Sequence, residues 1–358
     1  MRCTATPPQY EYRSTSDEGT AVALTEQEQE VLTGFPMPSD PDALLDRARR
    51  PIVRTPTSEP RFPFPVPNGW FIVAEARDLV PGALTSMRVF GSDVVLFRGE
   101  DGAPYMVDAY CAHLGAHVGV GGRVEGDCIR CPFHGWRYDG VTGRCNEIPY
   151  GDMDRIPSKA RIRSYPCVER NHMIWAWHHL EEGEPFYDIP EVAEFSDPSW
   201  LPYEMVEFDV ATCCQEMAEN NVDFAHFKYV HGTDAIPDDD FYAEGTYKRT
   251  VSGNGSFVRE GFGLGLGVLR ISGYTTFLSS TTPIDAENVK VRWVFTCPAA
   301  NGPDAAKEAA RGFSAGVSQD LPIWENKRYV DRPVVTKSEK KLLEQRQWVK
   351  QFYSPYDG

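Results

Sequence analysis

The stretch YCAHLGAHVGVGGRVEGDCIRCPFHGW, residues 110–136, places three cysteines and three histidines in one glycine-rich run. Thiolates and imidazoles are side chains that bind transition metals in proteins. The glycines between them let the backbone turn tightly and approach a bound group closely. The stretch therefore predicts a metal centre held by loops, and the nature of this centre decides how the rest of the chain is interpreted.

Two assignments of the ligands are open. Cys128 and Cys131 form a C-x2-C pair, which with two histidines would make a tetrahedral zinc site. Alternatively, Cys111-x-His113 and Cys131-x2-His134 each supply one thiolate and one imidazole. This suits a Rieske-type [2Fe–2S] cluster, with both thiolates on one iron and both imidazoles on the other. The flanking glycines favour the cluster, because backbone amides can then approach its sulfides.

The composition limits the classes of partner. The chain has 358 residues and a formal net charge of −16, so nucleic acid and anionic membranes are poor partners. No stretch approaches the roughly 20 apolar residues of a membrane span, and the start lacks the apolar core of a signal peptide. We therefore expect no integral membrane segment. Nine cysteines, an odd number and far from disulfide-dense, favour a reduced protein of the cytoplasm.

The character of the sequence changes along the chain. Residues 1–61 are polar and proline-rich, which predicts an N-terminal arm with short helices at 24–32 and 42–49. Residues 62–180 hold short β-rich runs broken by Gly, Asp and Asn, including a hairpin expected to turn at 91–93. They predict a compact all-β domain, and both ligand-bearing loops lie between its strands.

Residues 181–358 predict a second, larger domain. Strand-like runs mix there with a helix-like stretch at 215–229, and apolar spacing predicts a last helix over 338–353. The fold class is therefore α+β, with a small all-β domain before a larger α+β domain. An electron carrier of one domain would end near residue 180, so the second domain needs a further function.

A second metal site is predicted in the helix-like stretch. Asp223, His226 and His231 are spaced D-x2-H-x4-H. At ~100° per residue, positions 223 and 226 share a helix face, and the two imidazoles converge if the helix bends or ends between them. Two histidines, one carboxylate and vacant positions for O₂ make an open Fe(II) site. The alternative is a helix whose histidines pack against a core.

These two motifs resemble those of a known enzyme family. CAH…CPFHGW (111–136) and ENNVDFAHFKYVH (219–231) are similar to the signatures of the oxygenase component of Rieske non-haem iron oxygenases. FPVPNGWF, GRCNEIPY and IPEV add a similarity to the steroid-directed branch, the Neverland-type cholesterol 7-desaturases and the 3-ketosteroid 9α-hydroxylases. The resemblance extends over residues 62–353.

The resemblance implies a fold and an assembly. A Rieske [2Fe–2S] domain would occupy 62–180. A catalytic domain would occupy 181–358, with an antiparallel helix-grip (START-like) sheet around a non-haem iron. The assembly would be a homotrimer.

The resemblance also implies roles for single residues. The cluster would be bound by Cys111, His113, Cys131 and His134. The iron would be bound by His226, His231 and Asp320, an aspartate shortly before an IWxN sequence as in steroid-acting members. Asp223 would not bind metal but would join His134 of one subunit to His226 of the next by hydrogen bonds. Asn220, or its neighbour Asn221, would support the iron site.

The expected function is that of a terminal oxygenase with O₂ as co-substrate. The glycine run 261–267 lacks the G-x-G-x-x-G spacing and reads as a strand, so NAD(P)H would act only through a separate ferredoxin or flavin reductase. Its small residues alternate with Phe262, Leu264 and Leu266, which would make room for a steroid or another bulky apolar ligand. Core packing explains this pattern equally well.

Two alternatives remain at this point. Desaturation and hydroxylation share their first step, the abstraction of hydrogen from carbon, so sequence motifs do not separate a desaturase from a hydroxylase of steroids or of other polycyclic rings. A non-enzymatic alternative is a Rieske electron-transfer protein whose second domain binds a partner. It predicts a cluster but no mononuclear iron.

Overall fold

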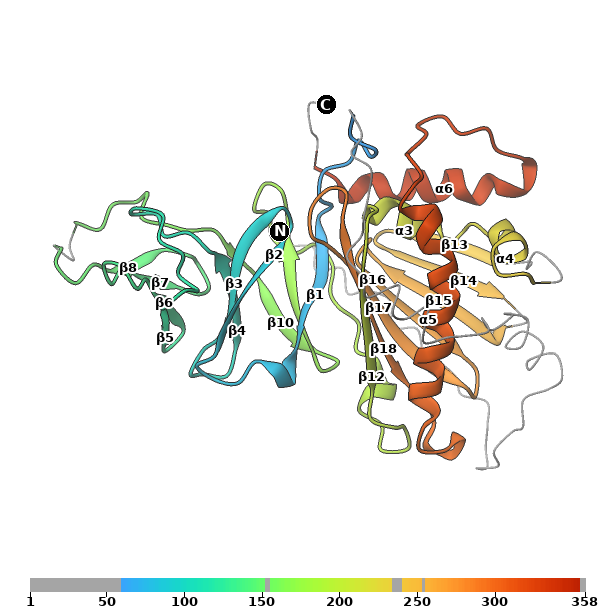
Figure 1. The fold of residues 1–358 in the computed structure, drawn as a ribbon, viewed down its shortest axis with the longest axis horizontal. Coiled ribbons are helices and arrows are strands. Elements are labelled where there is room, and N and C mark those ends of the chain that lie inside the picture. The colour runs from blue at the N-terminus through green and yellow to red at the C-terminus, as the bar shows by residue number, and fades with distance from the viewer. Residues whose placement is uncertain (1–58, 152–154, 234–239, 253–254, 355–358) are drawn as a thin grey trace, which may run out of the picture.

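The computed structural model describes residues 59–151, 155–233, 240–252 and 255–354, and the helices predicted at 24–32 and 42–49 lie outside them. Three small sheets come first along the chain and one large sheet follows (Figure 1). Among the described residues, no helix is both long enough and apolar enough to cross a membrane.

The first part is all-β, as predicted. One sheet joins β1 (Gly69–Glu75), β11 (Met173–His178) and β10 (Cys167–Arg170). A second joins β2 (Leu84–Val89), β3 (Ser92–Arg98), β4 (Pro104–Asp108) and β9 (Ser164–Tyr165). A third joins β5 (Arg123–Glu125), β6 (Cys128–Arg130), β7 (Arg137–Asp139) and β8 (Cys145–Glu147).

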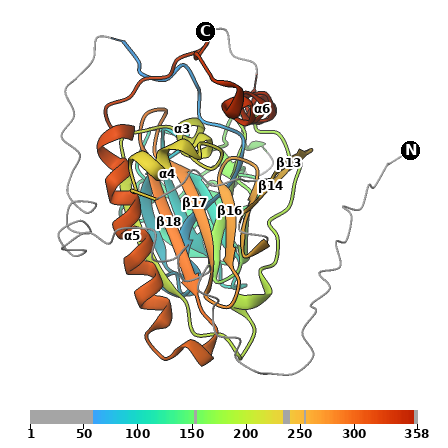
Figure 2. The same cartoon turned by 90° about the vertical axis from the view of Figure 1, so that its right-hand side faces the viewer.

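The second part is built on one antiparallel sheet of seven strands, in the order β12-β18-β17-β16-β15-β14-β13. The strands are β12 (Glu204–Val210), β13 (Asp240–Glu244), β14 (Tyr247–Ser252), β15 (Phe257–Phe262), β16 (Leu266–Ile271), β17 (Thr275–Pro283) and β18 (Val289–Thr296). The helices are α3 (Cys214–Glu219), α4 (Ala225–Tyr229), α5 (Ala305–Trp324) and α6 (Lys340–Val349). In Figure 2, α5 and α4 lie on the same side of this sheet. The predicted α+β class is confirmed.

Three local predictions are corrected. The hairpin turns at Phe90 and Gly91, both at positive φ, and residues 92 and 93 already belong to β3. The stretch 215–229 is not one helix, because Asn220, Asn221 and Asp223 are poor helix formers and separate α3 from α4. The run 261–267 is not one strand but the end of β15, a turn and the start of β16.

The helix predicted over 338–353 is present as α6 with a 3₁₀ turn at each end. The long helix α5 had not been predicted. Its start at Ala305 is rich in alanine, the best helix former, so composition alone carried a signal. The 3₁₀ turns among the described residues include Ala76–Asp78, Ala193–Phe195, Ala299–Asn301, Lys337–Glu339 and Lys350–Phe352.

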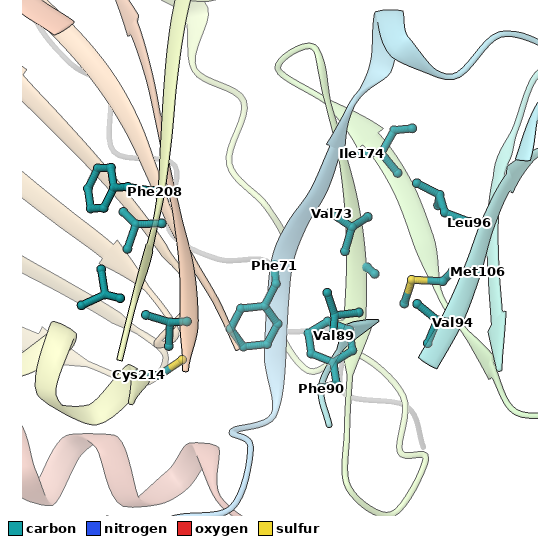
Figure 3. Close-up of a cluster of buried hydrophobic side chains, with 14 of the residues drawn as sticks. Phe71, Val73, Val89, Phe90, Val94, Leu96, Met106, Ile174, Phe208 and Cys214 are labelled. Atoms are coloured by element: carbon teal, nitrogen blue, oxygen red, sulfur yellow. The ribbon is translucent and has the colours of Figure 1, made fainter. Parts of the chain in front are cut away.

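One hydrophobic core joins the two parts of the molecule. Phe71 and Val73 of β1 pack with Val94 and Met106 on one side and with Phe208 on the other (Figure 3). Backbone groups of β1 are also bonded to the large sheet. The Ile72 N–H donates to the Ser280 hydroxyl (3.0 Å), and the Ile72 carbonyl accepts from Thr282 and from Arg292 (2.7 Å each). The two parts are therefore fixed against each other.

The ends of the described chain close on this unit. The Asn68 N–H, directly before β1, donates to the Phe352 carbonyl (2.6 Å), and the Asn68 amide donates to the Ser354 hydroxyl (3.0 Å). Helix α6 is joined to α3 by a buried ion pair in which Arg346 donates to both carboxylate oxygens of Glu219 (2.8 and 2.9 Å). The C-terminal segment thus supports both β1 and α3.

Arg61 caps the C-terminal end of α5. Its buried guanidinium donates to the carbonyls of Trp324 (3.1 Å), Glu325 (2.8 Å) and Lys327 (3.0 Å), and also to that of Ala211 (2.6 Å). The last carbonyls of a helix lack partners within it, and a cation there also compensates the helix dipole. Arg61 therefore fixes the end of α5 to the residue that follows β12.

We predict that Arg61→Met lowers the free energy of unfolding by about 2–4 kcal/mol, because several buried carbonyls lose a charged donor at once. Urea denaturation followed by tryptophan fluorescence measures the change. Arg328→Met is the matched control, since Arg328 is 66% exposed and should shift stability by less than about 0.5 kcal/mol. Equal stability of the two variants would contradict the capping role.

Candidate metal centres and cavity

The two loops of the first motif have the same local geometry. In one, the Gly115 N–H donates to the Cys111 carbonyl (2.9 Å), and in the other the Gly135 N–H donates to the Cys131 carbonyl (3.2 Å). Both glycines lie in the left-handed region, with φ of 71° and 73°. A side chain would strain these turns. The glycine pattern therefore builds two equivalent turns, each with a cysteine at its start and a histidine inside it.

The four predicted cluster ligands face one another across these turns. The rings of His113 and His134 are 4.6 Å apart, centroid to centroid, and His113 stacks on Trp136. Cys111 and Cys131 are both buried. Burial raises the pKa of the Cys131 thiol and the nearby Cys111 thiol helps to raise it, while backbone N–H groups at Phe133 and His134 oppose the rise.

This arrangement fits a [2Fe–2S] cluster. The Nδ1 atom of His113 is buried and has no hydrogen-bond partner among the described residues, which is costly unless the nitrogen has a ligand. Cys128, the thiol that the zinc assignment needs, bonds instead to Asp127 (3.1 Å) and Asn146 (3.3 Å). The residues therefore support one thiolate and one imidazole from each loop.

The second predicted set also comes together. Ligand atoms of His226 (α4), His231 (just after α4) and Asp320 (α5) all lie within 4.8 Å of one another. The His231 Nε2 atom is 3.4 Å from an Asp320 carboxylate oxygen. Asp320 and His231 are buried, so a cation between them would satisfy a buried carboxylate.

The remaining ring nitrogens of the two histidines are occupied. Nδ1 of His226 lies 2.5 Å from the Asp223 carbonyl, and Nδ1 of His231 lies 2.8 Å from the Gln319 side-chain oxygen. Donation to these oxygens directs the Nε2 atom of each histidine toward a metal. The His226 Nε2 atom is indeed buried without a hydrogen-bond partner among the described residues. The triad therefore fits a mononuclear iron.

The pKa values of the two histidines shift in opposite directions, according to the balance between burial and nearby carboxylates. Burial lowers the pKa of His226 more than Asp320 and Asp223 raise it. Burial also acts to lower the pKa of His231, but the hydrogen bond and charge of Asp320, with Gln319, give a net rise. The negative field of Asp320 thus attracts a cation, whether proton or metal, between the histidines.

The other predicted site residues lie beside the triad. Asp223 is 42% exposed at its side chain, with a carboxylate oxygen 3.9 Å from His226 Nδ1, so it is accessible from outside the chain. Asn220 and Asn221 both line the cavity described next. Gln319 had not been predicted. Gln319 directly precedes Asp320 in the sequence. A glutamine at this position does not indicate a role at a metal site until α5 is known to place it beside His231.

A cavity of about 390 Å³ opens beside the triad, which forms part of its wall. Ligand sites commonly have volumes of roughly 300–1,000 Å³. Much of the remaining wall is apolar or backbone and comes from α5, the facing strands and the turn between β15 and β16, including Phe257, Leu264, Leu269, Phe277, Phe313 and Trp293.

Glycines enlarge this cavity. Gly312 and Gly316 are one turn apart on α5, and a Cβ atom on either would meet nothing within 4 Å. The predicted glycine run 261–267 also lines the cavity. Its other expected use, core packing, holds as well: a Cβ atom on Gly265 would lie 2.4 Å from the Phe71 ring. The run therefore both lines the cavity and packs against the core.

Two family models match the chain. The Rieske [2Fe-2S] domain matches residues 69–166, and the 3-ketosteroid 9alpha-hydroxylase C-terminal domain matches residues 176–353. A cholesterol 7-desaturase from Caenorhabditis elegans is 31% identical over 331 residues, covering 80% of this chain and 77% of its own length. A probable 3-ketosteroid-9-alpha-monooxygenase oxygenase component from Rhodococcus rhodochrous is 29% identical, with coverages of 80% and 79%.

The fold is also found among solved structures. NdmA of Pseudomonas putida CBB5 has a TM-score of 0.64 at 21% identity, covering 78% of this chain and 88% of its own. The chain therefore belongs to the Rieske non-haem iron oxygenases, in the family of oxygenase components that includes the cholesterol 7-desaturases and the 3-ketosteroid 9α-hydroxylases.

This family defines the chemistry of the chain. It is an O₂-dependent oxidoreductase that uses a Rieske [2Fe–2S] cluster and a mononuclear iron, and a separate reductase supplies its electrons. The predicted class and cofactors are confirmed. Neither alternative, a zinc site or a non-enzymatic electron-transfer protein, is confirmed.

We predict that Asp320→Ala loses about one iron per chain and keeps the Rieske cluster, because an open iron site needs its carboxylate. Iron and acid-labile sulfide analysis, with electron paramagnetic resonance after dithionite reduction, measures both centres. Glu325→Ala, just beyond the end of α5, is the control and should keep all iron. Full iron in Asp320→Ala would show that the third ligand is another residue.

Proposed function

We propose that this oxygenase component acts on a steroid, into which it introduces a double bond or a hydroxyl group. The observation that carries the proposal is the largely apolar cavity with the His226, His231 and Asp320 triad in its wall. The similarity to cholesterol 7-desaturases and to 3-ketosteroid 9α-hydroxylases supports the same substrate class.

The proposed ligands are those that the geometry brings together. Cys111, His113, Cys131 and His134 would hold the cluster, and the triad would hold the iron. When bound, the cluster supplies single electrons and the iron supplies O₂ activation. The protein's own part is to orient the substrate against the triad and to exclude water. Asn220 or Asn221 would contribute a polar group at the edge of the apolar wall.

The cavity suits a rigid fused-ring molecule. Glycines on α5 expose helix backbone to one side of the cavity, so a flat apolar skeleton can lie directly against the helix. Phe277 and Phe313, which meet edge to face with ring centroids 5.0 Å apart, give a firm apolar surface nearby. A rigid wall positions one carbon of the substrate next to the triad, and such positioning lowers the entropic part of the barrier.

We further propose a homotrimer in which the subunits are arranged head to tail. The loops of the proposed cluster lie beside β5–β8 at one end of the long axis, and α4 lies at the other end (Figure 1). Leu114, Phe133 and Tyr150 are more than 60% exposed around the loops, and Tyr229 of α4 is 79% exposed. Such exposed apolar groups at both ends are typical of surfaces that a partner covers.

The proposed assembly gives Asp223 its role. Its carbonyl holds His226, and its exposed carboxylate can accept a hydrogen bond from His134 of the partner subunit. One residue would thus join the surroundings of both metal centres. None of the eight described cysteines forms a disulfide, which supports a reducing compartment, and we propose the cytoplasm.

We predict that Asp223→Asn keeps both metals and a reducible cluster but lowers turnover by roughly two orders of magnitude, because the charged bridge between subunits is lost. Metal analysis, electron paramagnetic resonance and single-turnover assays with a surrogate reductase separate binding from transfer. Asp240→Asn, an exposed aspartate at the start of β13, is the control. Normal turnover in Asp223→Asn would disprove the bridging role.

We predict that Gly312→Leu lowers kcat/KM for a steroid by roughly tenfold or more, because the new side chain fills the cavity next to the substrate. Lys307→Leu on the exposed face of α5 is the matched control and should retain activity. Product formation is measured by mass spectrometry over a panel of steroids and small aromatic compounds. Equal loss for small aromatic compounds would indicate a folding defect in place of a steric block.

A further inference from the structure

Lys248 is a buried cation in the wall of the substrate cavity. It lies on β14, is 7% exposed, and is one of the residues that line the cavity. Strand pairing places it opposite Gly261, which pairs in turn with Gly267 and so with Ser279. Because directly paired residues point to the same face of a sheet, Lys248 is on the face that carries the cavity.

The side chain of Lys248 has a defined position. Its stem lies across Gly261, where a Cβ atom would be 2.5 Å from the Lys248 Cε atom. Its ammonium nitrogen lies 5.2 Å from the centre of the Trp348 ring on α6. The missing side chain at position 261 thus gives the lysine room to lie flat, and the indole face stabilises its charge only partly.

Within the described residues, no hydrogen bond or ion pair joins Lys248 to another side chain. The cavity also contains the cation Arg259, whose guanidinium lies 5.0 Å from the Phe257 ring and whose Nη2 donates to Ser252 (3.2 Å). Lys248 itself therefore has no carboxylate partner among the described residues.

The acidic residues of the cavity wall either pair with other groups or lie away from Lys248. Glu260 bonds to Tyr247 and pairs with Arg270, and Asp320 pairs with His231. Glu308 is exposed and belongs to α5, which packs on β12 and β18, whereas β17, β16 and β15 separate β18 from β14. A buried ammonium without an anion nearby is unfavourable. An anionic group on a ligand would supply the partner that Lys248 lacks.

We propose that the substrate carries a carboxylate and that Lys248 binds it, which fixes the orientation of the ring system against the metal triad. The inference rests on the proposed steroid oxygenation and deepens it, since it names the substrate class as acidic steroids. Charge and position agree, because the cation is at the β14 side of the cavity and Asp320 comes from α5, which packs on β12 and β18 toward the opposite edge of the same sheet.

The electrostatics of the free protein support this class of ligand. Burial, with a smaller contribution from the positive charge of Arg259, lowers the pKa of Lys248 to about 7. A bound carboxylate would favour the ammonium form and form a charge-assisted hydrogen bond in an apolar environment. A neutral ester or alcohol offers no such gain.

The test is calorimetric binding to the oxidised holoenzyme without reductase, so that no turnover enters the readout. The probes are a 3-keto steroid that ends in a side-chain carboxylate and its methyl ester. The unaltered enzyme should bind the acid roughly 10–100-fold more tightly than the ester, as expected for a hydrogen bond to a charged group. Lys248→Met should remove this preference and leave ester binding unchanged.

Lys290→Met is the matched control, because Lys290 pairs with Glu207 and Asp209 and is not part of the cavity wall. Equal affinity for acid and ester in the unaltered enzyme would overturn the role of Lys248 and leave the steroid function standing. Retention of the preference for the acid in Lys248→Met would also overturn the role of Lys248 and leave the steroid function standing. Failure of both probes to bind the unaltered enzyme would overturn the steroid function as well. The comparison on the unaltered enzyme does not depend on how the variant folds.

Discussion

The structure depends on a buried contact, the packing of β1 between two sheets. Phe71 reaches one core that continues to Met106 on one side and to Phe208 on the other, and Ile72 is bonded to the large sheet through its backbone. A shared core of this kind does not allow one part to turn against the other without exposing apolar surface. The loops beside β5–β8 are therefore held at the opposite end of the molecule from α4 (Figure 1), and in the proposed trimer electrons would pass between subunits.

Helix α5 combines tasks that are usually divided among several elements. It carries Asp320 and Gln319 beside His231, and it opens the cavity through Gly312 and Gly316. A change in the register of this helix would replace the Asp320 carboxylate by another group at the proposed iron site. Capping of its C-terminal end fixes its register, and packing on β12 and β18 fixes its distance from the sheet.

The sequence predicted the order of domains and most of the candidate metal-binding residues, because both depend on local spacing. The C-x-H and C-x2-H pairs are read within one loop each, and D-x2-H-x4-H lies within nine residues. Asp320, the third member of the triad, follows His231 by 89 positions. Only the resemblance of the sequence around Asp320 to a family motif indicated its role. Helix α5 was missed because alanines and glycines give a weak periodic signal, although they are what a cavity wall needs. Lys248 and Gln319 carry no motif, and their roles follow only from what β14 and α5 place next to them.

The ion pair between α6 and α3 has a consequence for the order in which the two predicted metal sites can form. Arg346 reaches Glu219 from α6 and follows it by 127 positions along the chain. The strands β13–β18 and helix α5 lie between these two residues, so they are synthesised before α3 can gain this partner. The segment that carries the two histidines is therefore supported late in synthesis, whereas the cluster loops are complete by residue 136.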